Sequence, residues 1–527
     1  MHDPLRQGSR VVCLCLALLC VLPSHPFGND IDERLLTYQE LTKLYINRPL
    51  PADLESRLDN LLSVAFVTNR PNTSLPPLSS QASLGQYIRV AHWNIERGIE
   101  YDALEAALTS EAKFEALLRT DRFPLGREAR REILDQASAL RAADVIVLNE
   151  VDWGMKRSGY RNIAGDLAAR LNFHFAFGVE FVELSPVYLN DNPETHDELF
   201  SLDTDRYRGL HGTAILSRFP LENVRLIPFK NQPYDWFREE KQNVSMIEKA
   251  RRKLIKTVFR EDAFREVRRG GRTVLLADII DPRFPSGRAT IAATHIEIRT
   301  TPKLRQAQLG ELLDIIKPIK NPVIIAGDMN TSGQDMTPTN LKREISKRFG
   351  KPEYWLRTGV NTLLGLGLIE DVISASLQFG RNHGDPTVRH IPVVMPNEER
   401  RFFSQLKDFR FDDGGSIDFR GEAARSTKGR SNTFANSNER DEKGFVTTFR
   451  LNRPVKFLGK FKLDWIFVKP VHLFDPSDYQ GSYLFAPHFG RTLDAVTGAI
   501  ESRISDHHPM IVDLPLLEPS IKKVKGK

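Results

Sequence analysis

The chain has 527 residues, 41% of them hydrophobic, and its 74 Lys and Arg residues exceed its 68 Asp and Glu residues, giving a formal net charge of +6. This composition is sufficient for a large buried core, and the length alone would allow roughly three domains. All three cysteines lie within the first 20 residues, so a disulfide framework in the rest of the chain is excluded.

Residues 1–28 are typical of a targeting segment. Arg6 and Arg10 precede an apolar run over residues 11–22, and two prolines follow it. The run is too short to cross a bilayer comfortably as a helix of the mature protein. We therefore predict a signal peptide and a secreted or periplasmic protein. The alternative is an uncleaved N-terminus that is buried or that anchors the chain to a membrane.

Residues 29–86 are predicted to form a helical arm followed by a linker. Two helices are expected in the first part, the second with Pro51 near its first turn and with Asp53 and Glu55 at the positive end of its dipole. The Pro- and Ser-rich stretch after Pro71 predicts the linker. We expect the arm to pack on or cap the remaining chain.

The main domain is predicted over residues 87–516, followed by a basic tail over 517–527. Several of its strand-like runs lead into acidic, amide or histidine side chains. Polar groups at strand ends are held rigidly and open into a cleft, where α/β proteins bind ligands. Five such segments occur, at residues 93–96, 148–152, 326–330, 462–467 and 505–509.

The pattern between these segments predicts an α/β (α+β) fold. Helices are expected over Glu111–Arg141, with a break near Phe123–Gly126, and over Gly159–Leu171. Between Thr273 and Asp328 the pattern is strand, strand, helix, strand. Such an order suits two packed β-sheets with helices on their outer faces.

Two insertions are predicted within this domain. The first, about residues 221–272, carries ten Lys or Arg residues against four acids between Glu248 and Arg272. The second, about residues 344–460, contains a polar segment rich in Gly and Ser over 412–443. We expect this segment to be a long mobile loop near the site, because Asp464 follows it closely.

The acids among the five segments suit a magnesium site. Phosphate esters are anionic, so attack by a carboxylate is repelled unless a divalent cation neutralises the charge. Mg²⁺ prefers oxygen ligands and is usually held by one or two carboxylates with water and substrate oxygens. Glu150 and Asp506 suit this role, and Glu96 is a third candidate. The alternative for Glu96 is a solvated acid in a loop.

The other polar residues suit the activation of water and the binding of a phosphoryl group. Asp328 is the candidate that activates water, and Asn94 and Asn330 would donate hydrogen bonds to phosphoryl oxygens. His507 would donate another, with its tautomer fixed by the buried acid Asp464. Taken alone, Asp328 and Asn330 are equally compatible with an ordinary turn after a strand.

These segments together resemble the endonuclease/exonuclease/phosphatase superfamily, the DNase I-like metal-dependent phosphohydrolases. The resemblance runs from about Tyr87 to about Pro515 and includes three further stretches, at residues 212–218, 293–308 and 367–371. It implies a four-layer sandwich of two mixed β-sheets flanked by helices.

The resemblance also implies residue roles. Glu150 would be the principal metal ligand, with Asp506 beside it and Glu96 less secure. Asp328 and Asn330 would position the attacking water and the phosphate, Asn94 would contact phosphate or metal-bound water, and Asp464 would pair with His507. His295 would be a second phosphate contact or an acid; the alternative is a structural histidine. Asn149 stands where the family more often has Gln, at a structural position.

Three basic residues are candidates for substrate binding. Arg305 lies in the stretch that resembles the family's "T-H-L … R-x-x-Q" pattern, and Lys249 and Arg252 lie in the basic insertion. A basic helix can attract a polyanion, either nucleic acid or an anionic membrane. The alternative is that these charges only solvate one face of a helix.

The sequence therefore predicts an exported Mg²⁺-dependent phosphoesterase, with Mn²⁺ as an alternative ion. Its substrate would be a nucleic acid, a phospholipid headgroup or an inositol phosphate. Membership of the family does not decide between these substrates. Three hypotheses follow: a nuclease of low specificity, a phosphodiesterase or phosphatase for lipids or small molecules, and a non-catalytic binding protein of the same fold. No protein partner is predicted, and a monomer is expected.

Overall fold

A computed structural model of the protein describes much of the chain between residues 33 and 519. The described residues are 33–46, 49–70, 75–118, 126–184, 202–241, 245, 246, 248, 249, 253, 266–332, 385–388, 397–431, 434, 438–441, 444–455, 458–473 and 483–519. The chain divides into two compact units, residues 1–35 and 36–527, and the fold described below belongs to the second. The predicted targeting segment 1–28 and the tail beyond residue 519 lie outside the described residues. No helix of the described part is long and apolar enough to cross a bilayer.

The first sheet has nine strands. Its central order runs β1 (Phe66–Thr68), β5 (His174–Glu183), β6 (Leu210–Ser217), β4 (Val145–Trp153), β3 (Gly85–Asn94), β20 (Met510–Pro515) and β19 (His488–Thr492), with β2 (Ser79–Gln81) beside β3 and β8 (Arg268–Gly270) beside β5. Strands β3 and β4 are parallel, whereas β20 runs antiparallel to β3. The sheet is therefore mixed.

The second sheet has five strands. Their order is β16 (Asp464–Lys469), β11 (Val323–Asp328), β10 (Arg288–His295), β9 (Thr273–Ile280) and β7 (Leu221–Pro228). Only β10 and β11 are parallel, and α11 (Pro302–Ile316) connects them. The predicted order of strand, strand, helix and strand between Thr273 and Asp328 is confirmed.

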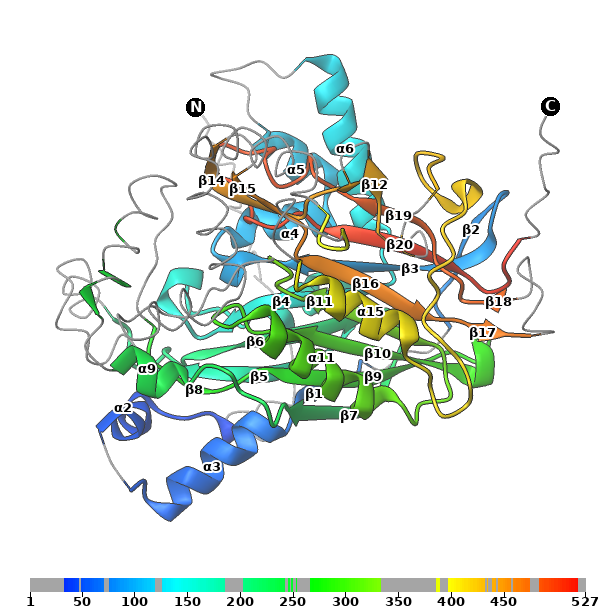
Figure 1. Cartoon of the computed structure of the whole chain (residues 1–527). Helices are drawn as coiled ribbons and strands as arrows, with labels where there is room; N and C mark the ends of the chain where they lie inside the picture. The colour runs from blue at the N-terminus through cyan, green and yellow to red at the C-terminus, as the bar shows by residue number, and fades with distance from the viewer. Residues whose placement is uncertain are drawn as a thin grey trace, which may run out of the picture. The chain divides into compact units, whose positions relative to one another are not determined.

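Helices cover the outer faces of both sheets (Figure 1). On the first sheet, α7 (Ile163–Leu171) contacts β4, β5 and β6, and α4 (Tyr101–Thr109) packs on α7 and on α6 (Arg127–Arg141). On the second sheet, α11 and α15 (Arg400–Asp408) lie together, and Phe402 and Leu406 of α15 join the apolar layer over the strands. The remaining helices and turns are α2 (Tyr38–Ile46), α3 (Ala52–Ser63), α5 (Glu111–Leu117), α9 (Trp236–Lys241), η1 (Glu96–Gly98), η2 (Lys156–Ser158), η4 (Pro285–Gly287) and η5 (Ala423–Arg425).

One apolar core lies between the two sheets. It combines side chains of the first sheet, such as Val90, Val147 and Ile215, with side chains of the second, such as Leu275 and Ile324. Strands covered on both faces need apolar residues at nearly every position, which explains the continuous run over 145–148. The predicted four-layer sandwich is confirmed. Three short strand pairs complete the described fold: β12 (Arg440–Asp441) with β13 (Gly444–Phe445), β14 (Phe449–Val455) with β15 (Leu458–Phe461), and β17 (Val471–His472) with β18 (Tyr483–Leu484).

The structure differs from three of the predicted boundaries. The end of the arm and the linker contribute β1 and β2 to the first sheet, so these residues are part of the sandwich. The first predicted insertion contains β7 and β8, which pair with β9 and β5. In the second, Asp418 and Arg425 are buried and form ion pairs, and both lie close to Glu518. This described part of the 412–443 segment is therefore anchored, contrary to the predicted mobile loop.

A glycine is needed at position 327 because the strands β10 and β11 approach each other closely there. A Cβ at this position would lie 1.9 Å from the carbonyl oxygen of Thr294 on the neighbouring β10. We expect Gly327→Ala to lower the free energy of unfolding by at least about 2–3 kcal/mol, because the backbone must move. Urea unfolding measures this, with Gly498→Ala as the control because nothing lies within 4 Å of its added Cβ. Equal losses in both variants would contradict the packing argument.

Candidate active site

The register of the strands brings the predicted site residues to one end of both sheets. Asn94 at the end of β3 is paired with Asn149 in the middle of the parallel strand β4, and His295 is paired with Asp328 at the ends of β10 and β11. Asp464 begins the antiparallel β16 directly opposite Asp328. Asp506 and His507 lie shortly before β20, whose first residue is paired with His92. The structure therefore brings these residues together from distant segments of the chain.

Asp328 lies at the centre of this group. The side-chain amide of Asn94 donates to Asp328 Oδ2 at 3.2 Å and to Glu150 Oε1 at 3.3 Å. The backbone N–H of Asn330 donates to Asp328 Oδ1 at 2.8 Å. His295 Nε2 and His507 Nε2 lie 3.6 and 3.7 Å from Asp328 Oδ2. Burial, followed by the Asp464 carboxylate, raises the pKa of Asp328 to about 7.

Asp464 holds two histidines. Its Oδ2 lies 2.7 Å from His507 Nδ1 and its Oδ1 lies 2.9 Å from His92 Nε2. The predicted pairing of Asp464 with His507 is therefore present. Burial opposes protonation of His507, but the carboxylates of Asp464, Asp328 and Asp506 outweigh it and raise its pKa well above the usual value. A protonated His507 would be a hydrogen-bond donor on the side of Asp328.

His295 lies in an electrostatic environment opposite to that of His507. Its Nδ1 is 2.8 Å from a guanidinium nitrogen of Arg272, which also contacts the carboxylates of Glu180 at 2.7 Å and Glu297 at 3.2 Å. Burial and the Arg272 charge lower the pKa of His295 well below the usual value. His295 is therefore neutral at physiological pH.

A third part of the site contains several carboxylates. Glu96 accepts from the backbone N–H of Asp506 at 2.8 Å and from Arg503 at 3.2 Å. Burial and the neighbouring Glu96 raise the pKa of Asp506 well above its usual value. Burial raises the pKa of Glu150, but the Arg97 guanidinium and nearby histidines reverse this, so its pKa is lowered overall.

Three site residues adopt left-handed backbone conformations. Glu96, Glu150 and Asn330 have φ values of 47°, 52° and 49°. Such values are uncommon for residues other than glycine, and they concentrate where surrounding structure imposes them, often at functional sites. Glu150 also lies at a register shift between β4 and β6, which is typical of a β-bulge. The bulge re-aims the Glu150 side chain within an otherwise regular strand.

The donor set of these carboxylates fits a hard divalent cation. Glu150, Asp506 and Glu96 offer only oxygen atoms. Besides burial, the Glu150 carboxylate raises the pKa of Glu96, and the carboxylates of Glu96 and Glu150 raise the pKa of Asp506. A bound cation would remove this repulsion between the carboxylates, and a magnesium-type ion needs only one or two carboxylates with water and substrate. These residues therefore fit the metal that the sequence predicts.

In the described part of the chain, the group of three ligand side chains whose atoms lie closest together is a different one. Asp328, Asp464 and His507 offer ligand atoms that all lie within 4.8 Å of one another. However, both oxygens of Asp464 and the Nδ1 of His507 already take part in hydrogen bonds. Mixed nitrogen and oxygen ligands also suit zinc better than magnesium. Asp464 and His507 are thus better explained as a hydrogen-bonded pair in which the histidine carries the proton.

The sequence model of the endonuclease/exonuclease/phosphatase family matches residues 91–507, which include every one of these site residues. The chain belongs to this family. Members are metal-dependent hydrolases of phosphate esters, so this chain is an enzyme of that class. The match covers most of the sandwich, without β1, β2 and β20, and agrees with the sequence prediction.

Solved structures of similar fold have low sequence identity to the chain. They include an endonuclease/exonuclease/phosphatase protein from Beutenbergia cavernae, with 16% identity over 82% of this chain and 72% of the other and a TM-score of 0.31. The human nocturnin catalytic domain has 15% identity over 81% and 94%, with a TM-score of 0.33. The 3′ phosphatase NExo from Neisseria, solved with a product DNA hairpin, has 13% identity over 81% and 99%, with a TM-score of 0.35. A search of curated proteins gave no match.

Not every predicted residue lies with this group. Arg305 is fully buried in α11 and forms an ion pair with Glu399 of the second insertion, so its predicted role in substrate binding is corrected to a structural one. Lys249 is exposed, and in the described part of the chain its backbone N–H donates to the Ser245 carbonyl and not to a site residue. Arg252 lies outside the described residues, as does the 367–371 stretch. The amide of Asn330 donates to the Ile296 carbonyl at 2.8 Å, which fixes its orientation.

Several residues that support the site were missed by the sequence analysis. His92 is buried against Asp464, and its place two residues before Asn94 on the same face of β3 could have indicated it. Arg272 appeared only as one of many basic residues in an insertion. The amide of Asn149 accepts from the Asp328 backbone and donates to Thr213, consistent with the structural role predicted for it.

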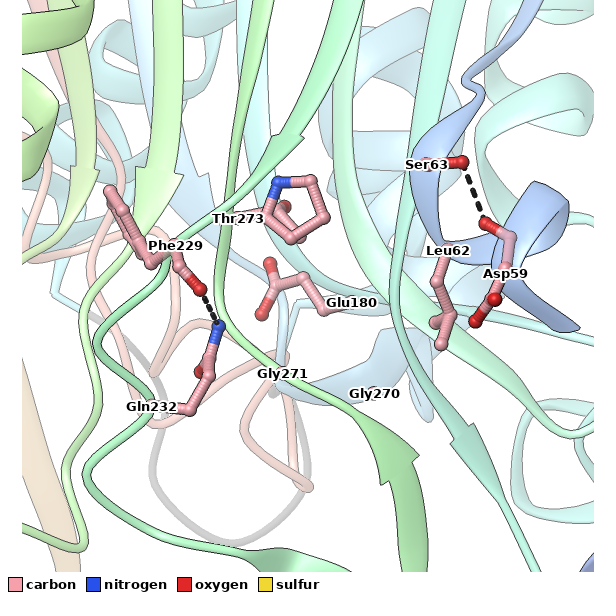
Figure 2. A pocket seen from close by; sticks show the side chains of 10 residues that line it. Asp59, Leu62, Ser63, Glu180, Phe229, Gln232, Gly270, Gly271 and Thr273 are labelled. Atoms are coloured by element: carbon pink, nitrogen blue, oxygen red, sulfur yellow. Dashed lines mark hydrogen bonds between the residues drawn. The ribbon is translucent and has the colours of Figure 1, made fainter.

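A cavity of about 360 Å³, the rear cavity, lies between α3 and residues of both sheets (Figure 2). Glu180 connects the rear cavity with Arg272, because it lines this cavity and also contacts Arg272. None of the predicted site residues lines the cavity, so it is distinct from the catalytic centre. Its lining comprises Asp59, Leu62, Ser63, Glu180, Pro228, Phe229, Gln232, Gly270, Gly271 and Thr273.

Lys462, next to the site, is a buried lysine whose ammonium lies near Met510 Sδ and the Trp465 ring. Burial lowers its pKa from 10.5 to about 7. Between these values the unfolded chain binds more protons than the folded chain, so the free energy of unfolding should rise with pH. The contribution is at most about 1.4 kcal/mol per pH unit. Urea unfolding at pH 7, 8 and 9 should show this slope in the wild type and its loss in Lys462→Met. An unchanged slope in the variant would refute the assignment.

Proposed function

We propose that the protein is an exported Mg²⁺-dependent phosphoesterase in which a water attacks phosphorus in line with the leaving oxygen. The observation that carries this proposal is the position of the Asp328 carboxylate. It accepts from Asn94 and lies within 3.7 Å of the Nε2 atoms of both His295 and His507. A carboxylate among three phosphate-binding groups suits the orientation of a water toward a bound phosphoryl group.

Asp328 would accept the proton of the attacking water. A base is most effective when its pKa lies near the working pH, and the pKa of Asp328 is raised to about 7. The hydrogen bond from the Asn330 backbone fixes one carboxylate oxygen, which leaves the other oxygen facing Asn94 and the two histidines. The geometry therefore supports a single defined position for the water.

Neutral and cationic donors would hold the phosphoryl oxygens. Asn94 and His295 are neutral donors, and His507 is cationic because Asp464 raises its pKa. Donors that are already fixed before the reaction stabilise charge that develops in the transition state. His507 would also return a proton to the leaving oxygen, with Asp464 keeping the ring oriented.

The metal would be held by Glu150 with Asp506 and Glu96. When bound, such a cation neutralises charge on the phosphoryl group and the leaving oxygen. Mg²⁺ is proposed because every side-chain ligand atom is a carboxylate oxygen, with Mn²⁺ as an alternative that accepts the same ligands.

A panel of substrates tests this function. The purified chain would be assayed with Mg²⁺ on duplex DNA, RNA, sphingomyelin, an inositol phosphate and bis(p-nitrophenyl) phosphate, each beside Asp328→Ala. We expect hydrolysis of at least one phosphate ester that EDTA abolishes and that Asp328→Ala lacks. Hydrolysis that survives both treatments would reject the proposed mechanism.

The substrate class can be separated by ionic strength. Binding of a nucleic acid releases counterions, so its affinity falls steeply with salt, whereas the KM for a small phosphate ester changes little. A steep rise in KM for DNA or RNA between 50 and 200 mM salt would support a nuclease. A KM that is flat over this range for the preferred substrate would support a lipid or small-molecule phosphoesterase.

Export is proposed from the sequence of residues 1–28. The n-region arginines and the short apolar run support a signal peptide. Fractionation of cells that express the full chain and a chain lacking residues 1–28 tests it. Processed protein outside the cytoplasm is expected for the full chain alone, and equal cytoplasmic retention of both would contradict export.

A further inference from the structure

We propose that Arg272 is a positioning residue that keeps His295 as a permanent Nε2–H donor, so that His295 binds a phosphoryl oxygen and does not act as an acid. The identity of the acceptor rests on the proposed function. The sequence left two roles for His295, a phosphate contact or an acid, and its contact with Arg272 separates them.

The chemistry of the Arg272 contact assigns the tautomer. The guanidinium nitrogen and His295 Nδ1 are 2.8 Å apart, within hydrogen-bond distance. A guanidinium has only N–H donors and does not lose its proton in proteins, so Nδ1 must be the acceptor. In the neutral ring the other nitrogen then carries the proton. That Nε2–H group lies on the side of Asp328, 3.6 Å from its Oδ2.

Arg272 is itself held on several sides. Its side chain is almost fully buried and contacts Glu180 at 2.7 Å and Glu297 at 3.2 Å. Glu297 also accepts from the indole N–H of Trp236 at 3.0 Å. Two carboxylates therefore balance the guanidinium without any charge on His295, and a protonated His295 would lose its hydrogen bond and face a cation.

The backbone around Arg272 is fixed as well. The amide of Gln232 accepts from the Arg272 N–H at 2.9 Å and donates to its carbonyl at 2.8 Å. A Cβ on the preceding Gly271 would lie 2.4 Å from the Gln232 side chain, and one on Gly270 would lie 2.2 Å from the Glu180 carbonyl oxygen. Figure 2 shows Glu180, Gln232 and these glycines together at the rear cavity. Arg272 thus has little freedom to release His295.

The two histidines beside Asp328 consequently have different roles. His507 Nδ1 faces the Asp464 carboxylate, which favours a proton on both ring nitrogens. His295 Nδ1 lies 2.8 Å from the Arg272 guanidinium and farther, at 3.9 Å, from the Glu180 carboxylate, so the direct hydrogen bond favours one proton on Nε2 only. A neutral imidazole gives up its remaining proton far less readily than an imidazolium, so proton transfer to the leaving oxygen belongs to His507.

Side-chain NMR of the wild-type chain tests the tautomer without any substrate. The protein would carry ¹³C,¹⁵N-labelled histidine, and His295→Gln would identify the His295 resonances. We expect ¹⁵N and ¹³C shifts of the neutral Nε2–H tautomer that stay constant between pH 5.5 and 8, about one unit or more on either side of an ordinary histidine pKa. An Nδ1–H tautomer, or an imidazolium signal at pH 6, would overturn the proposal. This result is independent of whether a phosphate ester is hydrolysed.

A double-mutant cycle tests the coupling in the reaction. With bis(p-nitrophenyl) phosphate as the probe, Arg272→Gln and His295→Gln should each lower kcat about 10- to 100-fold, the range typical of partners that orient a site histidine. If Arg272 acts through His295, the kcat of the double variant should be no lower than the kcat of the less active single variant. Losses that multiply would show that Arg272 acts independently of His295 and would overturn the proposed coupling. If Arg272→Gln fails to fold, the NMR result still decides the proposal.

Discussion

Asp328→Asn is expected to reduce kcat for the preferred phosphate ester by about 10²- to 10⁴-fold, the usual contribution of a general base. The amide has nearly the same shape and can still accept from the Asn330 backbone, which now contacts Asp328 at 2.8 Å. It cannot accept the proton of the attacking water. The expected loss therefore appears in kcat, with little change in KM.

Activity and thermal unfolding of the same preparations measure this effect. Asp135→Asn is the matched control, because Asp135 is exposed on α6 and its contact with Arg131 is a surface pair of 3.7 Å. Surface pairs of this kind contribute little to stability. Asp328→Asn with wild-type kcat would remove Asp328 from the reaction, and loss in both variants would point to a general defect.

Glu150→Gln is expected to weaken Mg²⁺ binding by more than about 100-fold. Substitution of a residue that hydrogen-bonds to a metal ligand typically lowers metal affinity about 10- to 100-fold. Substitution of the ligand itself should lower the affinity more. Glu150 is also the carboxylate whose pKa is lowered by the neighbouring Arg97 and histidines, so it is ionised and available to a cation. The amide retains an oxygen but loses the charge that Mg²⁺ requires.

Isothermal titration with Mg²⁺ measures this affinity directly, and Glu128→Gln on the exposed start of α6 is the matched control. The comparison also separates the two candidate metal groups. Should Asp464→Asn abolish Mg²⁺ binding while Glu150→Gln leaves it intact, the cation would belong to the Asp328, Asp464 and His507 group instead.

The positions of the main site residues were predictable because most of them follow or begin an apolar strand run. The runs before Glu150 and Asp328 are continuously apolar, so the polar residues that follow them indicate a position that faces a cleft. Parallel pairing of β3 with β4 and of β10 with β11 then brings these positions together. The chemistry of phosphate esters explains why acids, amides and histidines are needed there.

Other features could not be predicted from local patterns. Arg305 can be buried because it forms an ion pair with Glu399. This partner lies 94 residues away along the chain, in a segment that appeared to be an insertion. Arginine is rarely buried without such a partner, and nothing near Arg305 in the sequence reveals one. The same limit applies to Arg272, whose partners Glu180 and His295 come from different sheets.

The short strands β1 and β2 also escaped prediction. Each has three residues, which is too few for an alternating pattern to stand out. Their place is decided by pairing with β5 and β3, far away in the case of β1. The arm was consequently separated from the domain to which it belongs.

The location of the cation tests the central claim most directly, because every proposed role depends on a metal beside Glu150 and a free Asp328. Crystals of the wild-type chain grown with Mn²⁺ would give an anomalous difference map in which the ion is identified by its own scattering. We predict a peak in contact with the Glu150 carboxylate, on the side of Asp506 and Glu96. A peak bound by Asp464 and His507, with no density at Glu150, would contradict the account.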